Sequence, residues 1–310
     1  MSNLAQATEP EAVIALAGLI SQGGLASGGQ VVMAGDPRQL GPIVRSSLAT
    51  ENGFAVPLIE RLMELPLYSR DAVGGGYDGR CITKLVRNFR SHPKLLQLPA
   101  ALFYSGKLQA CAPAQVVNSC LAFSGLTEEA RGRIPLLFHG VVGEDLREAA
   151  SPSFFNPAEA VVVLDYVAAL VAEGVRPADI GVITPYRRQV QKLRERLEVK
   201  GWREEVMVGT TEEFQGQERR VMLLTTVRSS SEFLLTDAQH KLGFLANPKR
   251  FNVAVTRARA LLVVVGNPHI LEQDREWRAL LEFCLQHGAY RGVPYPREQQ
   301  EEEAQGQLAG

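Results

Sequence analysis

Short apolar runs recur along the chain and alternate with longer segments of helical pattern. Most of these runs contain valine or isoleucine, and all are too short for core helices, so each predicts a buried strand. The predicted strands occupy residues 31–34, 136–138, 180–183, 221–227 and 261–265.

The segments between these runs carry helix signals. Asn156 is followed by Pro157 and then by Glu159, a pattern typical of a helix start, and it predicts a helix over 158–172. A second helix is predicted over 187–200. Its apolar face comprises Val190, Leu193 and Leu197.

Strands that alternate with helices imply an α/β fold, in which a parallel sheet is covered by helices on both faces. Ligands of such sheets bind in loops beyond the carboxyl ends of the strands. The loops after Ala34, Ile183 and Val265 are therefore the first places to look for a site.

Composition limits the function classes. The chain has 310 residues, 45% of them hydrophobic and 22% charged, which suits one large or two modest domains. The formal net charge of −1 gives no global positive field, so nucleic acid could be bound only by local basic clusters. Four scattered cysteines without a CxxC pair indicate neither a zinc site nor a disulfide framework, and favour a reducing compartment. We expect no membrane partner, since no apolar run reaches the length of a spanning helix.

Two stretches differ in composition from the rest. Residues 71–79 are rich in glycine and predict a flexible loop. From residue 297 onward the chain is rich in Glu and Gln and poor in apolar residues, which is typical of disorder.

The segment 35–42 (GDPRQLGP) leaves the first predicted strand and turns twice. Its glycines and prolines alone indicate a common strand exit. Gln39 adds chemistry, because a neutral amide can donate to a phosphate and accept from a water. It would report a terminal phosphate without adding charge.

Two basic segments contain no carboxylate. Residues 83–94 hold four cations and place Phe89 beside Arg90, and residues 249–259 hold four more. Such a run is usually a solvated surface. Here, however, an aromatic ring offers a face for a base, and a guanidinium can grip phosphate oxygens at two points. If residues 249–259 were helical, one face of the helix would carry Arg250, Ala254 and Arg257.

Two further segments contain threonine hydroxyls next to charged residues. Residues 181–189 run from a strand through Thr184 into a basic helix, and a helix N-terminus beside a hydroxyl is a natural phosphate site. Residues 208–218 gather two threonines and Glu218 before a strand, and such a carboxylate can accept from ribose hydroxyls. An amphipathic surface helix and a solvated acidic turn are the respective alternatives.

Taken together, these segments resemble the superfamily 1B helicases of the up-frameshift type. GDPRQL resembles motif III, NFRSHP motif IV, TPYRRQV the motif that follows, TTEEFQGQE motif V and KRFNVAVTRAR motif VI. The motifs occur in the family's order, and the resemblance extends from about Ala5 to Tyr290. The connecting sequence is most similar to the Moloney leukaemia virus 10 branch, which includes the Armitage-like helicases. The resemblance implies RecA-like domains, each a parallel sheet of the P-loop-NTPase type flanked by helices.

The resemblance also implies an ATP-binding set. It comprises Gly35, Asp36, Gln39, Phe89, Arg90, Glu218 and Arg257. Three of these, Gln39, Arg90 and Arg257, are expected to be catalytic. The two arginines would act as arginine fingers on the γ-phosphate. Gln39 would couple the γ-phosphate to the interface between the domains. Phe89 would stack on adenine, and Glu218 would bind the ribose.

A second implied set lines the nucleic-acid path through contacts that do not read sequence. It comprises Thr184, Pro185, Tyr186, Thr210 and Thr211. The family further implies ATP and Mg²⁺ as cofactors, and single-stranded RNA and ribonucleoprotein or small-RNA silencing factors as partners. It also implies a cytoplasmic location, in ribonucleoprotein granules, and a role in RNA silencing or decay. The expected activity is ATP-driven movement along RNA that unwinds duplex or remodels ribonucleoproteins.

Two motifs of the family do not occur in the 310 residues. There is no GxxxxGK[ST] loop for the phosphates, since Gly106-Lys107 is followed by Leu108, and there is no Asp-Glu pair for Mg²⁺. We therefore expect no ATP hydrolysis by this chain alone.

The first residues suggest how the chain relates to the family. Residues 5–11 resemble the segment that follows the Asp-Glu pair, which places Ser2 and Asn3 at the carboxylate positions. We expect the C-terminal part of a longer helicase. Its predicted domains are 1–75, a remnant of the first RecA-like domain; 76–292, the second RecA-like domain; and 293–310, a disordered tail.

Two alternatives stay open. A non-catalytic RNA-binding or partner-binding module would explain the missing phosphate loop, but it has no use for γ-phosphate sensors. A DNA helicase is the other, because phosphate and stacking contacts do not distinguish the two polymers, whereas a contact to a 2′-hydroxyl would.

Overall fold

The computed structural model describes residues 5–17, 31–70, 76–148, 153–230, 244–245 and 247–295. They form two compact units, which divide after Leu85, whereas the sequence placed a domain boundary after residue 75. Residues 296–310 of the predicted disordered tail, 293–310, lie outside the described residues, as do residues 71–75 of the predicted glycine-rich loop. The described tail residues are packed rather than disordered, because Val293 N donates to Gly140 O at 3.1 Å and Tyr295 is buried.

The first unit contains three described helices. They are α1 (Glu9–Ala17), α2 (Ser47–Glu51) and α3 (Leu58–Leu62). The side chain of Ser46 caps α2 by accepting from Ala49 N. Arg61 of α3 donates to both carboxylate oxygens of Glu9 at 2.6 and 2.7 Å, so this ion pair joins α3 to the start of α1.

The prediction of a buried strand over residues 31–34 is wrong. These residues have no strand structure, and Val32 is 89% exposed. A strand is stable only when a neighbouring strand pairs with its backbone groups. Among the described residues of the first unit there is no such neighbour, so the apolar run alone does not suffice.

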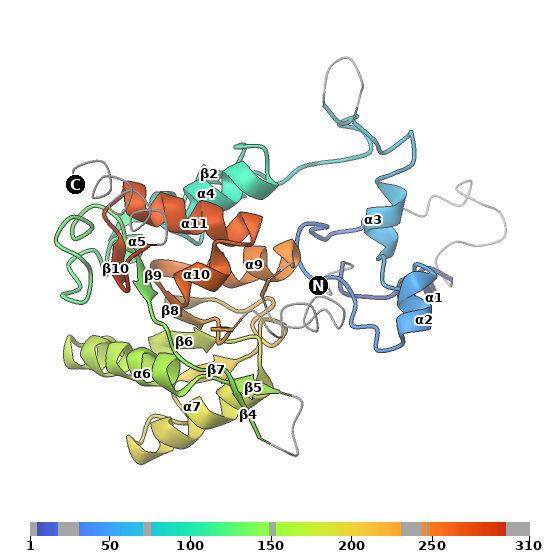
Figure 1. The fold of residues 1–310 in the computed structure, drawn as a ribbon. Coiled ribbons are helices and arrows are strands. Elements are labelled where there is room, and N and C mark those ends of the chain that lie inside the picture. Colours follow the sequence, from blue (N-terminus) through green and yellow to red (C-terminus); the bar gives the residue numbers. More distant parts are fainter. Residues whose placement is uncertain are drawn as a thin grey trace, which may run out of the picture. The chain divides into compact units, whose positions relative to one another are not determined.

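The second unit is built on a six-stranded sheet whose strands are all parallel, in the order β10-β3-β9-β8-β6-β7 (Figure 1). The strands are β3 (Leu136–Gly140), β6 (Ile180–Ile183), β7 (Met207–Gly209), β8 (Arg219–Thr225), β9 (Ala258–Gly266) and β10 (Tyr290–Gly292). Four of the five predicted strands are therefore confirmed. Their valine-rich and leucine-rich runs are buried on both faces, as a central parallel sheet requires.

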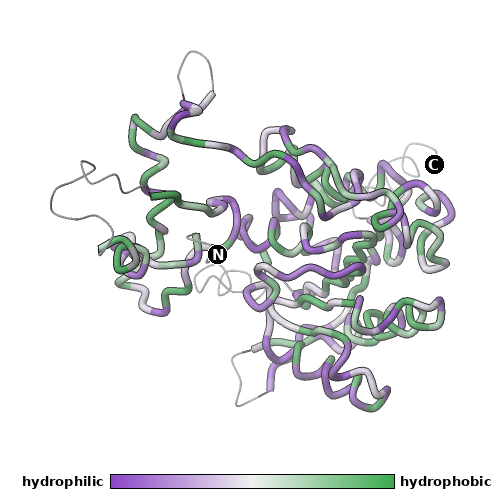
Figure 2. Tube along the Cα trace, turned by 180° about the vertical axis from the view of Figure 1, so that it is seen from behind, coloured by the Kyte–Doolittle hydropathy of each residue, from purple (hydrophilic) through white to green (hydrophobic). Residues whose placement is uncertain are grey.

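Helices cover both faces of this sheet, which confirms the predicted α/β class (Figure 1). One face packs against α6 (Pro157–Ala172) and α7 (Arg187–Val199). The other packs against α4 (Pro93–Phe103), α9 (Pro248–Val255) and α11 (Arg275–Gln286). Figure 2 shows the hydrophobic stretches of this unit concentrated in its interior.

The predicted helices begin and end as expected. The Asn156 side chain accepts from Ala158 N and Glu159 N, and Pro157 is the first residue of α6. Helix α7 begins at Arg187 and buries the predicted apolar face.

Short elements complete the second unit. Strand β1 (Arg87–Asn88) pairs in parallel with β2 (Gln109–Ala110), and β4 (Leu146–Arg147) pairs antiparallel with β5 (Phe154–Phe155). The remaining helices among the described residues are α5 (Ala114–Val117), η2 (Pro177–Asp179) and α10 (Pro268–Leu271). Within the described ranges, no helix combines the length and apolar character needed to cross a membrane.

Candidate functional site

Two groups of predicted site residues lie at opposite edges of the second unit's sheet. Glu218 directly precedes β8 and Arg257 directly precedes β9, and the two parallel strands start side by side at Arg219 and Ala258. Thr184 directly follows β6, and Thr210 directly follows β7. The first pair therefore lies at the amino edge of the sheet and the second pair at its carboxyl edge.

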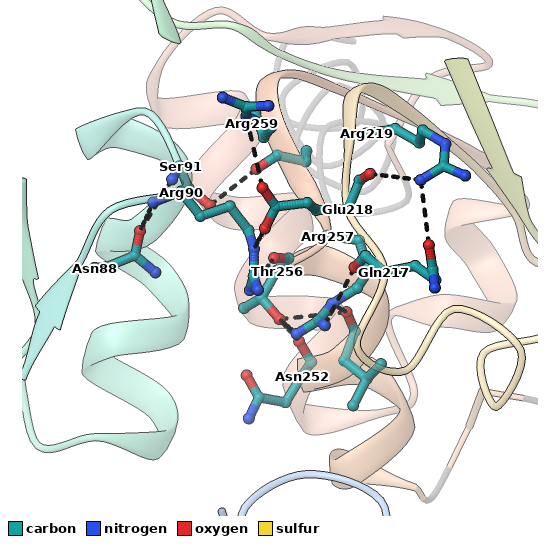
Figure 3. A network of polar contacts seen from close by, with 12 residues as sticks. Asn88, Arg90, Ser91, Gln217, Glu218, Arg219, Asn252, Thr256, Arg257 and Arg259 are labelled. Carbon is teal, nitrogen blue, oxygen red and sulfur yellow. Dashed lines mark hydrogen bonds and ion pairs between the residues drawn. The ribbon is translucent and has the colours of Figure 1, made fainter. Parts of the chain in front are cut away.

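The amino-edge cluster consists of Arg90, Glu218, Thr256, Arg257 and Arg259, which Figure 3 shows close together. Its centre is the Glu218 carboxylate. One oxygen accepts a hydrogen bond from Arg90 Nε, and the other lies 3.7 Å from Arg259 Nε. One carboxylate thus serves two guanidinium groups.

Arg90 is placed by a turn that docks on the start of β9. The Asn88 side-chain oxygen accepts from Arg90 N at 3.0 Å and from Ser91 N at 2.9 Å. Ser91 Oγ then donates to Ala258 O at 2.9 Å, and His92 N donates to Arg259 O at 2.9 Å. This turn leaves the Phe89 ring 66% exposed, so the ring is free to meet a planar group.

Arg257 is 2% exposed and is held by backbone oxygens. Its Nε donates to Val253 O at 3.0 Å, and a terminal nitrogen donates to Thr256 Oγ1 at 3.1 Å. Arg90 reaches the same threonine, because its Nη1 donates to Thr256 O at 3.4 Å. The structure therefore gathers both predicted arginine fingers around one residue.

One sequence prediction about this segment is wrong. Helix α9 ends at Val255, so Arg257 does not belong to a helical face with Arg250. The backbone changes to extended conformation to enter β9, and Arg257 turns back toward Val253. Arg250 instead pairs with Glu212, with its Nε at 2.8 Å from Oε1.

Gln39 belongs to the first unit and is described within it. Its side-chain nitrogen donates to Asp36 Oδ2 at 2.9 Å, and Arg38 N donates to Asp36 Oδ1 at 2.9 Å. Asp36, which follows Gly35, therefore organises the turn over residues 36–39. Both oxygens of its carboxylate accept hydrogen bonds within this turn.

The carboxyl-edge residues are buried. Thr184 and Thr211 have no exposed surface, and Thr210 is 8% exposed. The hydroxyls of Thr184 and Thr211 have no hydrogen-bond partner among the described residues. A buried hydroxyl without a partner is costly, so it calls for a functional or structural explanation.

Tyr186 lies differently from its predicted place on the nucleic-acid path. It is 3% exposed, its hydroxyl accepts from Arg228 Nε at 2.8 Å, and its ring packs edge to face with Phe154. Pro185, the residue between it and Thr184, is half-buried.

A buried polar network near this edge was not predicted from the sequence. Glu159 is fully buried and accepts from Thr225 Oγ1 at 2.6 Å and from Val227 N at 2.9 Å. Burial raises the pKa of Glu159 to about 7, although the hydrogen bonds from Thr225 and the backbone lower it. The only sequence signal, a glutamate three residues after a helix cap, suggested a local capping role instead.

No described group of three or more histidine, cysteine or carboxylate side chains could hold a metal ion. The amino-edge cluster fits an anion better than a cation, because two guanidinium groups pair with its one carboxylate and a third, that of Arg257, binds oxygens beside them. Mg²⁺ ligands are therefore not assigned to these residues.

A parallel α/β sheet that presents paired guanidinium groups at one edge is of the type found in nucleotide-binding domains. Residues 56–269 match the family model described as an AAA domain. The chain belongs to this family of superfamily 1 helicases.

Named relatives agree with this placement. The human RNA helicase Mov10l1 is 48% identical over 298 residues, which cover 94% of this chain and 24% of that protein. The chicken (Gallus gallus) helicase named MOV-10 is 47% identical over 321 residues, covering 96% and 32%, respectively. The Drosophila melanogaster protein named armi is 39% identical over 304 residues, covering 94% and 25%. The chain thus spans about a third or less of the length of these relatives.

Proposed function

We propose that this chain is the C-terminal motor half of an ATP-dependent RNA helicase, which moves along single-stranded RNA and unwinds duplex or remodels ribonucleoproteins. The observation that carries the proposal is that Arg90 and Arg257 both bind Thr256 while Glu218 pairs with Arg90. The names of the relatives support a role in RNA silencing or decay. Silencing factors as partners and a cytoplasmic location in ribonucleoprotein granules are proposed from the family resemblance alone.

At the amino edge, the terminal phosphate of ATP competes with Glu218 for Arg90. A phosphate carries more charge than a carboxylate and binds a guanidinium at two points, so it can displace the Glu218 oxygen. Arg257 already has a fixed direction, since its Nε is bound to Val253 O. Phe89 offers its exposed ring to the base, and the released Glu218 accepts from the ribose hydroxyls.

Mg²⁺ would neutralise the phosphate oxygens, as it does in related phosphoryl transfers. The residues described here supply cations and a ring to the nucleotide, while the metal and the phosphate loop must come from elsewhere in a working helicase. Gln39, on its turn with Asp36, is the residue of the first unit that we propose to sense the terminal phosphate.

At the carboxyl edge, RNA phosphates accept from the hydroxyls of Thr184 and Thr211, which have no exposed surface in this structure, so the residues that cover them must move when RNA binds. Both hydroxyls are buried and partnerless among the described residues, and phosphate contact would satisfy them. Contacts of this kind do not read sequence, as a motor that steps along any strand requires.

A segment exchange tests the proposal. This chain would replace the aligned segment of the full-length human RNA helicase Mov10l1, and RNA-stimulated ATP hydrolysis would be measured. Arg90→Ala and Arg257→Ala are expected to lower turnover by about 10³-fold or more, as the loss of an arginine finger does. Arg220→Ala, on β8 but bound to Ser119, is the matched control and should leave turnover near the parent level. An active exchange protein that tolerates both finger substitutions would disprove the nucleotide role.

The second candidate is a non-catalytic RNA-binding or partner-binding module. The specific observation in its favour is that the 310 residues contain neither a GxxxxGK[ST] loop nor an Asp-Glu pair. An exchange protein that binds RNA but does not hydrolyse ATP, although its parent does, would favour this candidate.

A further inference from the structure

Arg228 forms a buried ion pair just beyond the end of β8. Its Nη1 lies 2.8 Å from Asp145 Oδ2, and the two side chains are only 2% and 4% exposed. Asp145 lies in the segment between β3 and β4, and its Oδ2 also accepts from Ser230 Oγ at 3.1 Å. The pair therefore ties the segment after β3 to the segment after β8.

Two aromatic rings enclose the same guanidinium. Its central carbon lies 3.6 Å from the centre of the Phe154 ring and 5.1 Å from the centre of the Tyr186 ring. Arg228 Nε also donates to the Tyr186 hydroxyl at 2.8 Å. We name Asp145, Phe154, Tyr186 and Arg228 the carboxyl-edge clamp.

The chain just before Arg228 is held in an unusual conformation. Val227 has a φ of 72°, in the left-handed region that a β-branched residue rarely adopts. The surroundings impose this conformation, because Glu159 accepts from Val227 N at 2.9 Å and Asn156 Nδ2 donates to Val227 O at 3.0 Å. Strain that is fixed in this way commonly marks a functional position.

A buried ion pair can often be replaced by apolar residues of similar volume without loss of stability, because desolvation of the charges offsets their attraction. A planar guanidinium makes contacts in fixed directions: its edge binds Asp145, its Nε binds Tyr186 and its flat face lies against Phe154. We therefore infer that the clamp fixes the relative positions of these three side chains.

We propose that Arg228 is a positioning residue for RNA binding. It holds Tyr186 and thereby the turn over residues 184–186, which carries Thr184, one of the two threonines that we propose as RNA contacts. Thr184 N donates to Gly209 O at 3.1 Å, which links the same turn to the end of β7 and the neighbouring Thr210. The proposal rests on the proposed RNA-binding function. It also assigns Tyr186 an internal supporting role rather than a direct contact with RNA.

Substitutions of Arg228 in the full 310-residue chain test this role, with a short oligouridylate as the probe and fluorescence anisotropy as the readout. Arg228→Lys keeps the charge but loses the planar geometry, and we expect it to weaken RNA binding about tenfold. Arg220→Lys, on β8 near the other edge of the sheet, is the control and should change the affinity less than about twofold.

A second variant separates positioning from folding. Arg228→Met alone leaves Asp145 buried without its cation, whereas Arg228→Met with Asp145→Asn removes both charges. The double variant should unfold thermally near the wild-type midpoint, yet bind the RNA about as weakly as Arg228→Lys. Hydrogen exchange should show faster exchange at residues 184–187 than in wild type, with β8 and β9 still protected.

The outcomes are distinct. If wild type binds the RNA and both the lysine and the double variant bind it within about twofold of wild type, Arg228 has no positioning role. If wild type does not bind the RNA at all, the proposed function fails. Hydrogen exchange at residues 184–187 is then the remaining test of whether Arg228 holds this turn in place. Unchanged exchange there would refute it.

Discussion

Glu218 shows how one carboxylate can control the state of an active edge. It accepts from Arg90 and lies 3.7 Å from Arg259, so Arg90 is neutralised while no phosphate is present. If a phosphate takes Arg90, as we propose, Arg259 remains near Glu218 as a counter-ion. The proposed exchange would then leave the half-buried carboxylate with a cation nearby.

Glu218→Gln should reveal this competition. A neutral amide binds Arg90 more weakly than a carboxylate does, so inorganic tripolyphosphate should bind the variant about three- to tenfold more tightly than wild type. Titration calorimetry at low salt measures the difference. ATP should gain less than tripolyphosphate does, because the amide is also a weaker acceptor for the ribose. Glu205→Gln, at an exposed position after α7, should not change either affinity.

The buried Glu159 predicts a pH dependence of stability. Its pKa is raised from 4.5 to about 7 in the folded chain, so the folded state binds more protons than the unfolded state between these values. Stability should therefore fall as pH rises from about 4.5 to about 7, by roughly 3 kcal/mol from this group, and level off above. Glu159→Gln should remove that slope in urea unfolding, whereas Asp165→Asn, at an exposed position of α6, should keep it. Parallel pH profiles for wild type and Glu159→Gln would contradict the assignment.

Among the elements, the start of α6 has more than a capping role. Asn156 caps the helix, donates to Val227 O, and has its own N–H bound by Gln189. Asn156→Ala should thus cost about 2–4 kcal/mol, more than an isolated cap. Asp274→Ala, which removes the half-buried cap of α11, should cost about 1 kcal/mol. Chemical denaturation of the two variants gives the comparison, and equal losses would show that the contact to Val227 adds nothing.

Elements were predictable from sequence where local pattern and tertiary burial agree. Residues 180–183 and 261–265 are apolar, and each is paired with neighbours on both sides, so pattern and structure coincide. Residues 31–34 have the same pattern but no pairing strand among the described residues of their unit. An apolar pattern indicates that burial of a segment would be favourable. It does not show whether a neighbouring strand is available to pair with that segment.

The site was predictable only in part for a similar reason. Arg90, Glu218 and Arg257 lie in recognisable motifs, and the structure does bring them together. Arg228 and Asp145 meet across 83 residues of sequence, and neither lies in a motif that marks it. Long-range pairing of two isolated charges leaves no periodic signal, so the clamp could be found only in three dimensions.

At the scale of the whole molecule, the chain supplies cations but no phosphate cradle. The 310 residues lack the GxxxxGK[ST] loop and the Asp-Glu pair, and losing that cradle should cost at least as much as the 10³–10⁵-fold of an arginine finger. We therefore predict no RNA-stimulated phosphate release by this chain alone in a malachite-green assay. Release that disappears on Arg257→Ala would contradict this, since contaminating enzymes would not respond to the substitution.

The central claim is that one sheet serves nucleotide at its amino edge and RNA at its carboxyl edge. The most direct measurement compares Arg257→Ala with the double variant Thr184→Val, Thr211→Val in the segment-exchange helicase, recording turnover number, KM for ATP and RNA affinity. The account predicts that Arg257→Ala loses turnover while RNA affinity stays within about twofold. The valine variant should bind RNA at least about tenfold more weakly with KM for ATP unchanged, and should be as stable as its parent because each valine removes an unsatisfied buried hydroxyl. If the valine variant binds RNA normally, or if Arg257→Ala impairs RNA binding as much as turnover, the assignment of separate edges is wrong.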